Sequence, residues 1–202
     1  MNELSKQERY EKMKQIRDEV VALKNSPLYE FRVAEGNKPV IGEGSHFAEI
    51  MFVGEAPGKN EAASGRPFCG AAGRILDELL ASINIPREDV YITNILKDRP
   101  PGNRDPLPEE VELYAPFLDR QIEIIQPKII SALGRHSMAY LFSKFDLDFE
   151  LDQISKIRGK VFDAKAPHGS VKIIPLYHPA VAVYNPNQKD LLKTDFKILK
   201  EL

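Results

Sequence analysis

The chain has 202 residues, 43% of them hydrophobic and 29% charged, and a formal net charge of −2 at pH 7. This size and composition predict a single folded domain over residues 1–202 and exclude collagen-like, low-complexity and largely disordered chains. No run of about eighteen apolar residues is present, which excludes a membrane-spanning helix. The charged N-terminus lacks the apolar core of a signal peptide, so we expect a cytoplasmic protein.

Cysteine and histidine usage narrows the chemistry. The chain has one cysteine, Cys69, and four scattered histidines. One thiol excludes an internal disulfide, a four-cysteine zinc site and a four-cysteine iron–sulfur cluster, and the sequence predicts no metal site. Because the net charge is slightly negative, a nucleic-acid partner would need a local basic patch.

The predicted elements alternate between helices and short apolar strands. Residues 3–24 have apolar side chains three and four positions apart, which predicts a helix that stops at Ser26-Pro27. We therefore expect residues 1–25 to form a helical segment packed on the domain. Near-continuous apolar runs predict buried strands at residues 48–53, 90–96, 128–133 and 172–177. Further helices are expected at residues 71–83, 108–125, 135–143 and 188–201.

This alternation predicts an α/β fold, a three-layer α/β/α sandwich with a central, mostly parallel, four-stranded sheet. Residues 144–170 are the least patterned part of the chain, and there we expect only a short hairpin at residues 160–162.

Three segments rich in Gly, Pro or His follow predicted strands, at residues 54–58, 94–104 and 178–180. Ligands bind at the carboxyl ends of strands in open parallel sheets, so we expect the chemistry at these segments. The first segment lacks the Gly-Lys-Ser/Thr of a P-loop and the Gly-x-Gly-x-x-Gly of a dinucleotide site. It favours a placed carboxylate over a phosphate cradle, and an ordinary turn after the strand is equally compatible with it.

Taken one at a time, the residues of these loops have both a functional and a structural interpretation. Phe68 could stack on a flat ligand or belong to the core. Asn94 presents a donor and an acceptor side by side, as the edge of uracil requires, or it fixes a turn. His178 could donate to a developing anion or be structural. The basic segment 99–104 could contact phosphate or be a solvated loop. Together with Glu55, these residues form a set that chance does not readily produce.

These segments together resemble the uracil-DNA glycosylase superfamily, specifically its family 4, from about residue 23 to the end of the chain. The segments that carry the resemblance are Gly54-Glu55-Ala56-Pro57-Gly58 with Glu61 shortly after, Gly65-Arg66-Pro67-Phe68-x-Gly70-x-x-Gly73, Asn94-x-x-Lys97-x-Arg99-Pro100-Pro101-Gly102-Asn103-Arg104, Leu133-Gly134 and Tyr177-His178-Pro179-Ala180. The resemblance implies an enzyme that hydrolyses the N-glycosidic bond of deoxyuridine in DNA, releasing uracil and leaving an abasic site without cutting the strand.

The resemblance also implies roles for individual residues. Glu55 matches the catalytic carboxylate and His178 the histidine that steadies the departing base. Phe68 matches the aromatic ring that stacks on uracil, and Asn94 the amide that reads its edge. The further substrate-binding positions are Gly54, Ala56, Glu61 and Asn103, of which Ala56 and Glu61 are candidates for excluding the methyl group of thymine. We expect contacts with DNA from Arg66, Lys97, Arg99, Arg104, Arg135 and Tyr184.

The chain departs from the family pattern in two places. Family 4 enzymes usually carry a 4Fe–4S cluster on four cysteines, and the matching positions here are Leu23, Ser26, Asp98 and Tyr114. None of them supplies a thiolate, so the resemblance implies a variant without the cluster and without another cofactor. In its place we expect apolar packing by Leu23 and a hydrogen bond from the Tyr114 hydroxyl to the Asp98 carboxylate. Tyr184 stands where the family often has arginine, which favours stacking over phosphate pairing.

The expected partner is uracil-containing DNA, single- or double-stranded, bound by a monomer, with no membrane partner. One alternative is a glycosylase for another deaminated base, such as hypoxanthine or xanthine, against which Asn94 argues. A second alternative is a DNA- or partner-binding module without catalysis. A plain nucleotide-binding α/β domain is disfavoured by the absence of a phosphate loop.

Overall fold

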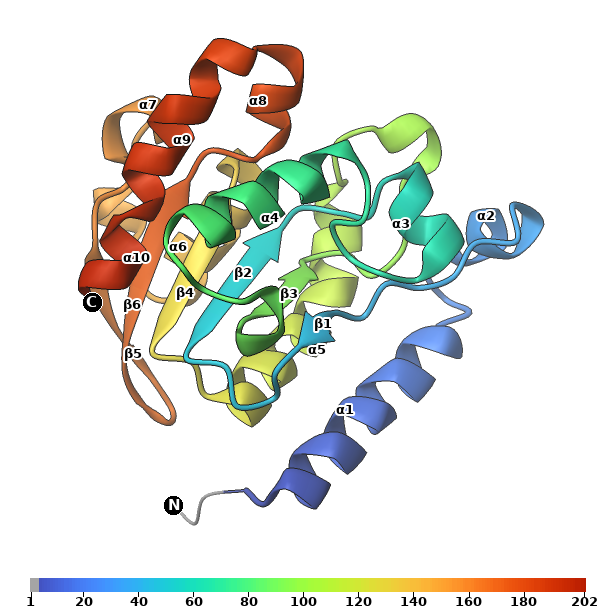
Figure 1. Cartoon of the computed structure of the whole chain (residues 1–202). Coiled ribbons are helices and arrows are strands. Elements are labelled where there is room, and N and C mark those ends of the chain that lie inside the picture. Colours follow the sequence, from blue (N-terminus) through green and yellow to red (C-terminus); the bar gives the residue numbers. More distant parts are fainter. Residues whose placement is uncertain (1–3) are drawn as a thin grey trace.

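A six-stranded sheet with the strand order β1-β3-β2-β4-β6-β5 forms the centre of the molecule (Figure 1). The computed structural model describes residues 4–202. Four neighbouring strands run parallel: β3 (Tyr91–Asn94), β2 (Ile50–Gly54), β4 (Ile129–Leu133) and β6 (Gly169–Leu176). They coincide with the predicted apolar runs, so the α/β class and the mostly parallel sheet are confirmed.

The predicted count of four strands is wrong, because a short antiparallel strand lies at each edge. β1 (Glu43–Gly44) pairs with β3, and β5 (Phe162–Ala166) pairs with β6. Two residues are too few to show a pattern, and β5 is half-exposed with charged residues between apolar ones. The hairpin predicted at residues 160–162 is the longer β5–β6 pair, whose turn lies at residues 167–168.

The helices described by the structure are α1 (Lys6–Val21), α2 (Tyr29–Ala34), α3 (Lys59–Ser64), α4 (Ala71–Ser82), α5 (Pro108–Ile125), α6 (Arg135–Lys144), α7 (Ile154–Ile157), α8 (Ala180–Tyr184), α9 (Lys189–Phe196) and α10 (Ile198–Glu201). Single 3-10 turns lie at Arg87–Asp89, Pro101–Asn103, Asp148–Glu150 and Pro186–Gln188. Among residues 4–202, no helix is both long and apolar enough to cross a bilayer.

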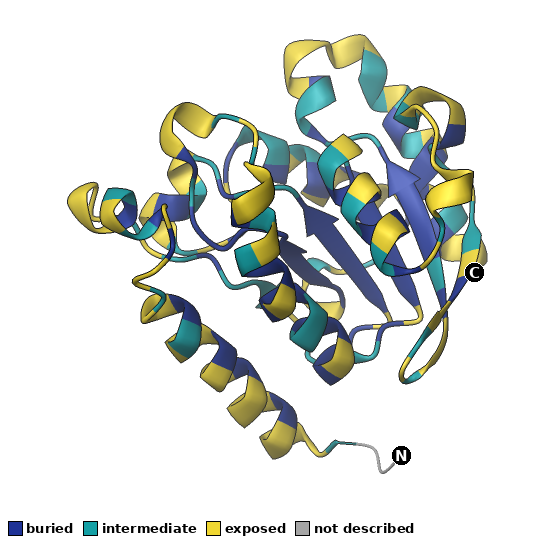
Figure 2. Ribbon diagram, turned by 180° about the vertical axis from the view of Figure 1, so that it is seen from behind, coloured by how far each residue is buried: buried dark blue, intermediate teal, exposed yellow. Residues whose placement is uncertain are grey.

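Helices pack against both faces of the sheet, because successive side chains of a buried strand point to opposite sides. Met51 and Val53 of β2 belong to a core cluster shared with α1, α5 and α6. Ile50 and Phe52 belong to a second cluster shared with α4, α9 and α10. Figure 2 shows the result, with the strands buried and the helices exposed on their outer sides.

The first helix is shorter than the predicted residues 3–24. Ser5 caps it, because the Ser5 hydroxyl accepts a hydrogen bond from the Glu8 N–H (3.3 Å) and the Glu8 carboxylate accepts one from the Ser5 N–H (2.8 Å). Residue 3, the predicted start, lies outside the described residues. The helix predicted at residues 188–201 is divided into α9 and α10 at Lys197.

A buried polar network joins the segment after α1, the end of β3 and α5. The Tyr114 hydroxyl donates to Asp98 Oδ2 (2.6 Å), and Ser26 Oγ lies 2.8 Å from the Tyr114 hydroxyl. Arg32 of α2 forms an ion pair with Asp98, with Nη1 2.9 Å from Oδ2. Leu23 packs against the adjoining core cluster. The predicted Tyr114–Asp98 bond and the packing of Leu23 are therefore confirmed.

Tyr114→Phe should lower the free energy of unfolding by about 1–3 kcal/mol, because it removes a hydrogen-bond donor from a fully buried carboxylate. Urea unfolding measures the loss. Tyr140→Phe is the matched control, since Tyr140 donates a bond of the same length (2.6 Å) to Asp119 at a half-buried position. A loss no larger than that of the control would contradict the importance of the network.

Candidate active site at the carboxyl edge of the sheet

The parallel strands end at a cavity of about 550 Å³. The arrowheads in Figure 1 point toward this side of the molecule, where α3 and α8 lie. Glu55, Phe68, Asn94 and His178 all line the cavity, so the structure brings the four central residues of the prediction together. Of the remaining predicted residues, those that also line it are Ala56, Glu61, Asn103, Arg104 and Tyr184.

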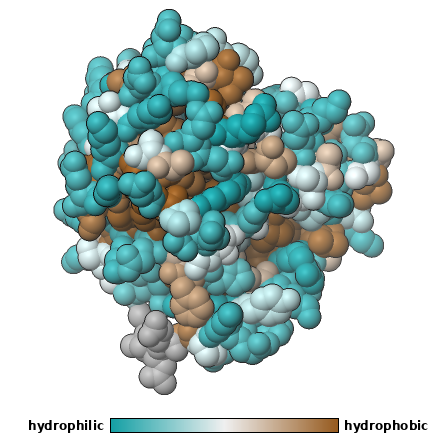
Figure 3. Space-filling view, in the orientation of Figure 1, coloured by the Kyte–Doolittle hydropathy of each residue, from teal (hydrophilic) through white to brown (hydrophobic). Residues whose placement is uncertain are grey.

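A second hollow, of about 610 Å³, lies at the opposite end of the strands, where Ile50 and Ile129 begin β2 and β4. Figure 3 shows apolar residues gathered there, below α4 and α10, on a largely hydrophilic face. The described residues that line this hollow include none of the predicted site residues. The cavity at the carboxyl edge is therefore the candidate active site.

Gly54 permits two site residues to meet. In the sheet register it lies beside Asn94. A methyl group on Gly54 would lie 2.3 Å from Asn94 Oδ1 and 2.9 Å from the Phe68 ring, closer than atoms in contact can approach. Gly54 does not itself line the cavity, but only a residue without a side chain lets the amide and the ring lie side by side.

The side-chain amide of Asn94 is available to a ligand. Asn94 is 2% exposed, and no hydrogen bond to its amide group comes from another residue between 4 and 202. Buried amides are almost always paired, so an amide that reaches the cavity without a protein partner suits a ligand that offers one donor and one acceptor.

Lys97 lies beneath Asn94 rather than at the surface. Its side chain is fully buried, and Nζ donates to the Asn94 carbonyl oxygen and to Gln121 Oε1 (both 2.7 Å). Burial lowers the pKa of Lys97 well below its ordinary value. The expected contact of Lys97 with DNA is therefore wrong, because no phosphate can reach the amine. Lys97 instead fixes the backbone at the end of β3.

His178 offers a hydrogen-bond donor to the cavity. The Ala180 N–H donates to His178 Nδ1 (3.1 Å), so the neutral ring carries its proton on Nε2. Burial lowers the pKa of His178 to about 4, with the Glu61 charge acting in the opposite direction. The imidazole is therefore neutral around pH 7. Its ring stacks on Phe68, with the centroids 5.4 Å apart and the planes at 28°.

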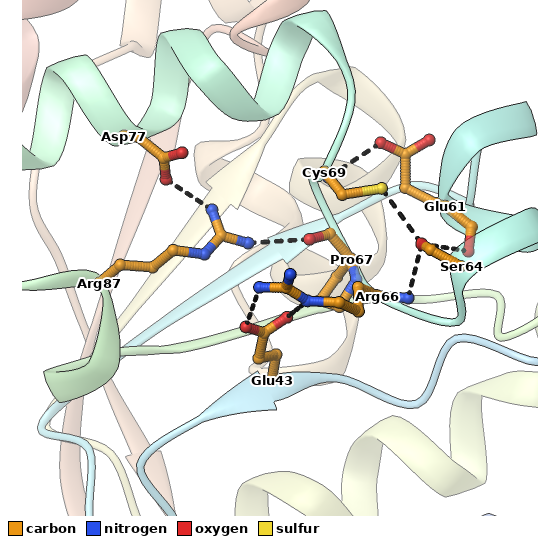
Figure 4. Close-up of polar contacts among 8 residues, drawn as sticks. All are labelled: Glu43, Glu61, Ser64, Arg66, Pro67, Cys69, Asp77 and Arg87. Atoms are coloured by element: carbon orange, nitrogen blue, oxygen red, sulfur yellow. Dashed lines mark hydrogen bonds and ion pairs between the residues drawn. The ribbon is translucent and has the colours of Figure 1, made fainter.

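The loop that carries Phe68 is held from both sides (Figure 4). Phe68 has a left-handed backbone (φ 47°), which is strained for a residue with a side chain. Glu61 Oε1 accepts hydrogen bonds from the N–H groups of Cys69 (3.2 Å) and Gly70 (3.0 Å), which follow Phe68. On the other side, Arg87 donates a hydrogen bond to the Pro67 carbonyl, just before Phe68 (2.8 Å), and forms an ion pair with Asp77 (2.7 Å). Phe68 is 6% exposed and belongs to the core, yet it also forms part of the cavity wall.

The arginines predicted to contact DNA already have partners in the free protein. Arg99 Nε donates to Asn103 Oδ1 (2.6 Å). The other three are in ion pairs: Arg66 with Glu43 at 2.7 Å, Arg104 with Glu110 at 2.5 Å and Arg135 with Asp105 at 2.5 Å. Among these arginines only Arg104 is part of the described cavity lining. Tyr184 is 88% exposed at the end of α8 and does line the cavity.

Two residues beside Glu55 are absent from the sequence-based prediction of the site. His136 Nε2 lies 3.7 Å from Glu55 Oε2 and 3.3 Å from Asp105 Oδ2. His136 lies in the first turn of α6, shortly after the end of β4, so the strand-end rule that selected the other segments could have found it. Asp105 has no comparable signal. Burial raises the pKa of Glu55, and the charge of His136 opposes this effect.

Glu55, Asp105 and His136 are also the group most like a metal site, because their ligand atoms lie within 4.8 Å of one another. Arg135 argues against a cation there. Its Nε donates to His136 Nε2 (3.1 Å) and its Nη2 to Asp105 Oδ2 (2.5 Å), which places a positive charge beside two of the three ligands. The arrangement instead suits control of the Glu55 carboxylate.

Comparison with known proteins shows the family to which the chain belongs. The family model of the uracil DNA glycosylase superfamily matches residues 41–200, and the chain belongs to this superfamily. Within it, the chain is 48% identical over 191 residues to the type-4 uracil-DNA glycosylase of Sulfurisphaera tokodaii, covering 94% of this chain and 84% of the relative. The type-4 enzyme of Archaeoglobus fulgidus is 51% identical over 163 residues, with 81% of each chain covered. Family membership makes the chain a uracil-DNA glycosylase, a hydrolase of DNA repair, close to the type-4 enzymes.

The 4Fe–4S cluster that family 4 enzymes usually carry does not fit the residues present. A single cysteine cannot bind such a cluster, and Cys69 is an exposed residue of the Phe68 loop. Three of the four positions expected to match cluster ligands are Ser26, Asp98 and Tyr114, and the Tyr114 hydroxyl is hydrogen-bonded to both of the others.

Gly54→Ala should lower kcat/KM for uracil release by about 100-fold, because the added methyl group must displace Asn94 or Phe68 by roughly 1 Å. Steady-state kinetics on uracil-DNA measures the loss, and thermal unfolding checks the fold. Gly36→Ala is the control, since it introduces a side chain at φ 63° but contacts nothing within 4 Å. Equal kinetics for both variants would show that the close approach at Gly54 is unimportant.

Proposed function

We propose that the cavity hydrolyses the N-glycosidic bond of deoxyuridine in DNA, with Glu55 acting on the sugar and His178 on the base. The observation that carries the proposal is the meeting of a carboxylate, a neutral Nε2–H donor and a buried amide without a protein partner in one cavity. Membership of the superfamily supports the same reaction and names its substrate.

Recognition of the base rests on Phe68 and Asn94. A base inside the duplex is out of reach, so uracil must leave the stack at a cost of a few kcal/mol. The ring of Phe68 then offers a flat apolar surface for stacking. The Asn94 amide accepts from uracil N3–H and donates to O4. Cytosine reverses this donor–acceptor pattern. Because Lys97 helps to hold the Asn94 backbone in place, the amide is not free to adjust to the reversed pattern, and the binding of cytosine is disfavoured.

Catalysis follows from where charge develops. As the bond breaks, positive charge grows on the sugar and negative charge on the uracil. The Glu55 carboxylate faces the positive charge on the sugar and can orient the attacking water. The His178 Nε2–H donates a hydrogen bond to the uracil carbonyl that gains negative charge. Both contacts strengthen in the transition state, which is the condition for lowering the barrier. Because His178 is neutral, it supplies a hydrogen bond and does not have to give up a proton.

Contacts with the DNA strand come from the rim of the cavity. Tyr184 is exposed beside the cavity, and its ring suits stacking against the bases next to the extruded nucleotide. Arg104 also lines the cavity, and Arg99 donates to Asn103 of the cavity lining, so both arginines suit phosphate contacts. Ala56 and Glu61 line the cavity and are the proposed contacts that exclude the methyl group of thymine.

The purified protein should release uracil from single- or double-stranded uracil-DNA, and Glu55→Gln should slow release by ~10²–10³-fold. Glu49→Gln is the matched control, because Glu49 is an exposed carboxylate at the opposite end of β2. Free uracil is quantified under single-turnover conditions, with inosine-DNA tested in parallel. Release of hypoxanthine but not of uracil would overturn the base assignment, and unchanged release by Glu55→Gln would overturn the role of Glu55.

His178→Phe keeps a ring against Phe68 but removes the Nε2–H donor. We expect kcat to fall by ~10²–10³-fold with little change in KM, because the lost bond forms mainly as the base departs. A steady-state series on the same DNA separates the two parameters. A rise in KM with kcat unchanged would assign His178 to ground-state binding.

A further inference from the structure

We propose that His136 is a positioning residue for the Glu55 carboxylate and that Asp105 and Arg135 hold its imidazole ring in place. This inference rests on the proposed catalytic role of Glu55. It concerns a residue that comes from a different strand end, since His136 is the second residue of α6 and follows β4, whereas Glu55 follows β2.

The contacts converge on one atom of the imidazole. His136 Nε2 lies 3.7 Å from Glu55 Oε2 and 3.3 Å from Asp105 Oδ2. The same atom accepts a hydrogen bond from Arg135 Nε at 3.1 Å. Arg135 in turn donates to Asp105 through Nη2 at 2.5 Å. The ring is therefore set between two carboxylates and a guanidinium, and Glu55 and His136 are equally exposed at 31%.

Two protonation states of the imidazole use these contacts differently. A neutral ring protonated on Nδ1 accepts from Arg135 through Nε2. An imidazolium carries a proton on Nε2 and pairs with Asp105 and Glu55 instead. The second state places a positive charge within 4 Å of the Glu55 oxygen, and an opposite charge at that distance favours the ionised carboxylate.

Glu55 needs this support because its other surroundings favour the acid form. Burial raises the pKa of Glu55, and the negative charge of Asp105 acts in the same direction, whereas His136 and Arg135 oppose them. The remaining charged or titratable groups of the described cavity lining are Lys59, Glu61, Arg104, His178 and Tyr184. Three of these are held by other partners, Glu61 by loop N–H groups, Arg104 by Glu110 and His178 by the Ala180 N–H.

The protonated form of Glu55 carries no negative charge, so it could not stabilise the positive charge that grows on the sugar. His136 therefore acts through Glu55 and does not need to touch the substrate. Its contribution is largest at the acid end of the working range, where the Glu55 carboxylate begins to take up a proton. This distinguishes a positioning role from simple packing, which affects the rate equally at every pH.

The test is the pH dependence of single-turnover uracil release by the full chain, for the wild type, His136→Gln and His168→Gln. Glutamine keeps a polar side chain but carries no charge. His168→Gln is the matched control, because His168 lies in the β5–β6 turn, bonded to the Pro127 carbonyl. Thermal unfolding and the Kd for uracil-DNA show whether each variant is folded and still binds.

We expect the acid limb of the His136→Gln profile to move to higher pH, because Glu55 loses its cationic neighbour and is protonated more easily. The rate should fall by about tenfold on the acid side and return to within about twofold of the wild type at alkaline pH, with Kd unchanged. His168→Gln should follow the wild-type profile. An unmoved acid limb in His136→Gln, or an equal loss at every pH, would overturn the proposal.

Glu55→Gln separates this failure from that of the proposed function. If Glu55 is the group that titrates, this variant is slow and its profile has no acid limb of the wild-type kind. A Glu55→Gln enzyme as fast as the wild type would overturn the catalytic role of Glu55 itself. A slow Glu55→Gln enzyme combined with an unmoved limb in His136→Gln would overturn only the role of His136.

Discussion

The approach of two side chains to the α-carbon of Gly54 is the constraint on which the rest of the site depends. The Asn94 amide and the Phe68 ring both occupy the space that a side chain of residue 54 would need. This contact requires the end of β3 to lie in register with the end of β2, and the Phe68 loop to fold back over both. Lys97 fixes the first from below, and Glu61 and Arg87 fix the second from the side. The amide and the ring that we propose for reading and stacking on the base are thus positioned before any substrate binds, which reduces the entropy lost on binding.

The polar network around Asp98 joins the N-terminal segment to the chain that follows β3. A buried ion pair stabilises a fold only when its remaining donors and acceptors are satisfied. Arg32 meets this condition, because it also donates to the Val20 and Val21 carbonyls at the end of α1 (3.0 and 2.6 Å). Those carbonyls carry the negative end of the helix dipole, so the guanidinium is stabilised twice. The Tyr114 hydroxyl completes the coordination of Asp98. Four buried side chains, those of Ser26, Arg32, Asp98 and Tyr114, thereby cross-link distant parts of the chain.

The accuracy of the sequence-based predictions follows from how local each signal is. The parallel strands are near-continuous apolar runs of their own residues, so they are recognised without knowledge of their neighbours. β1 is an edge strand of two residues that forms because β3 offers a free edge. Its own residues show no pattern that would predict a strand. Lys97 was misplaced for a related reason. The position of Lys97 in a polar loop segment does not indicate where its side chain points. The chain turns after Asn94, and the Lys97 amine points inward to Gln121. The Tyr114–Asp98 bond was predictable because the two positions were already expected to meet.

Charge pairing explains how a chain of net charge −2 presents a site for a polyanion. Arg66, Arg104 and Arg135 each have a carboxylate partner drawn from elsewhere in the sequence. A phosphate group that approaches must compete with these partners, so each new contact is an exchange of one anion for another rather than the pairing of a free cation. Exposed pairs contribute little in water and give way readily, as Arg66 and Arg135 can. The partner of Arg104 is the fully buried Glu110, which cannot be left unpaired without cost. Under the proposed function, Arg104 therefore serves as a fixed positive charge beside the cavity, and Arg66 and Arg135 are the arginines that can exchange their carboxylate partners for phosphate.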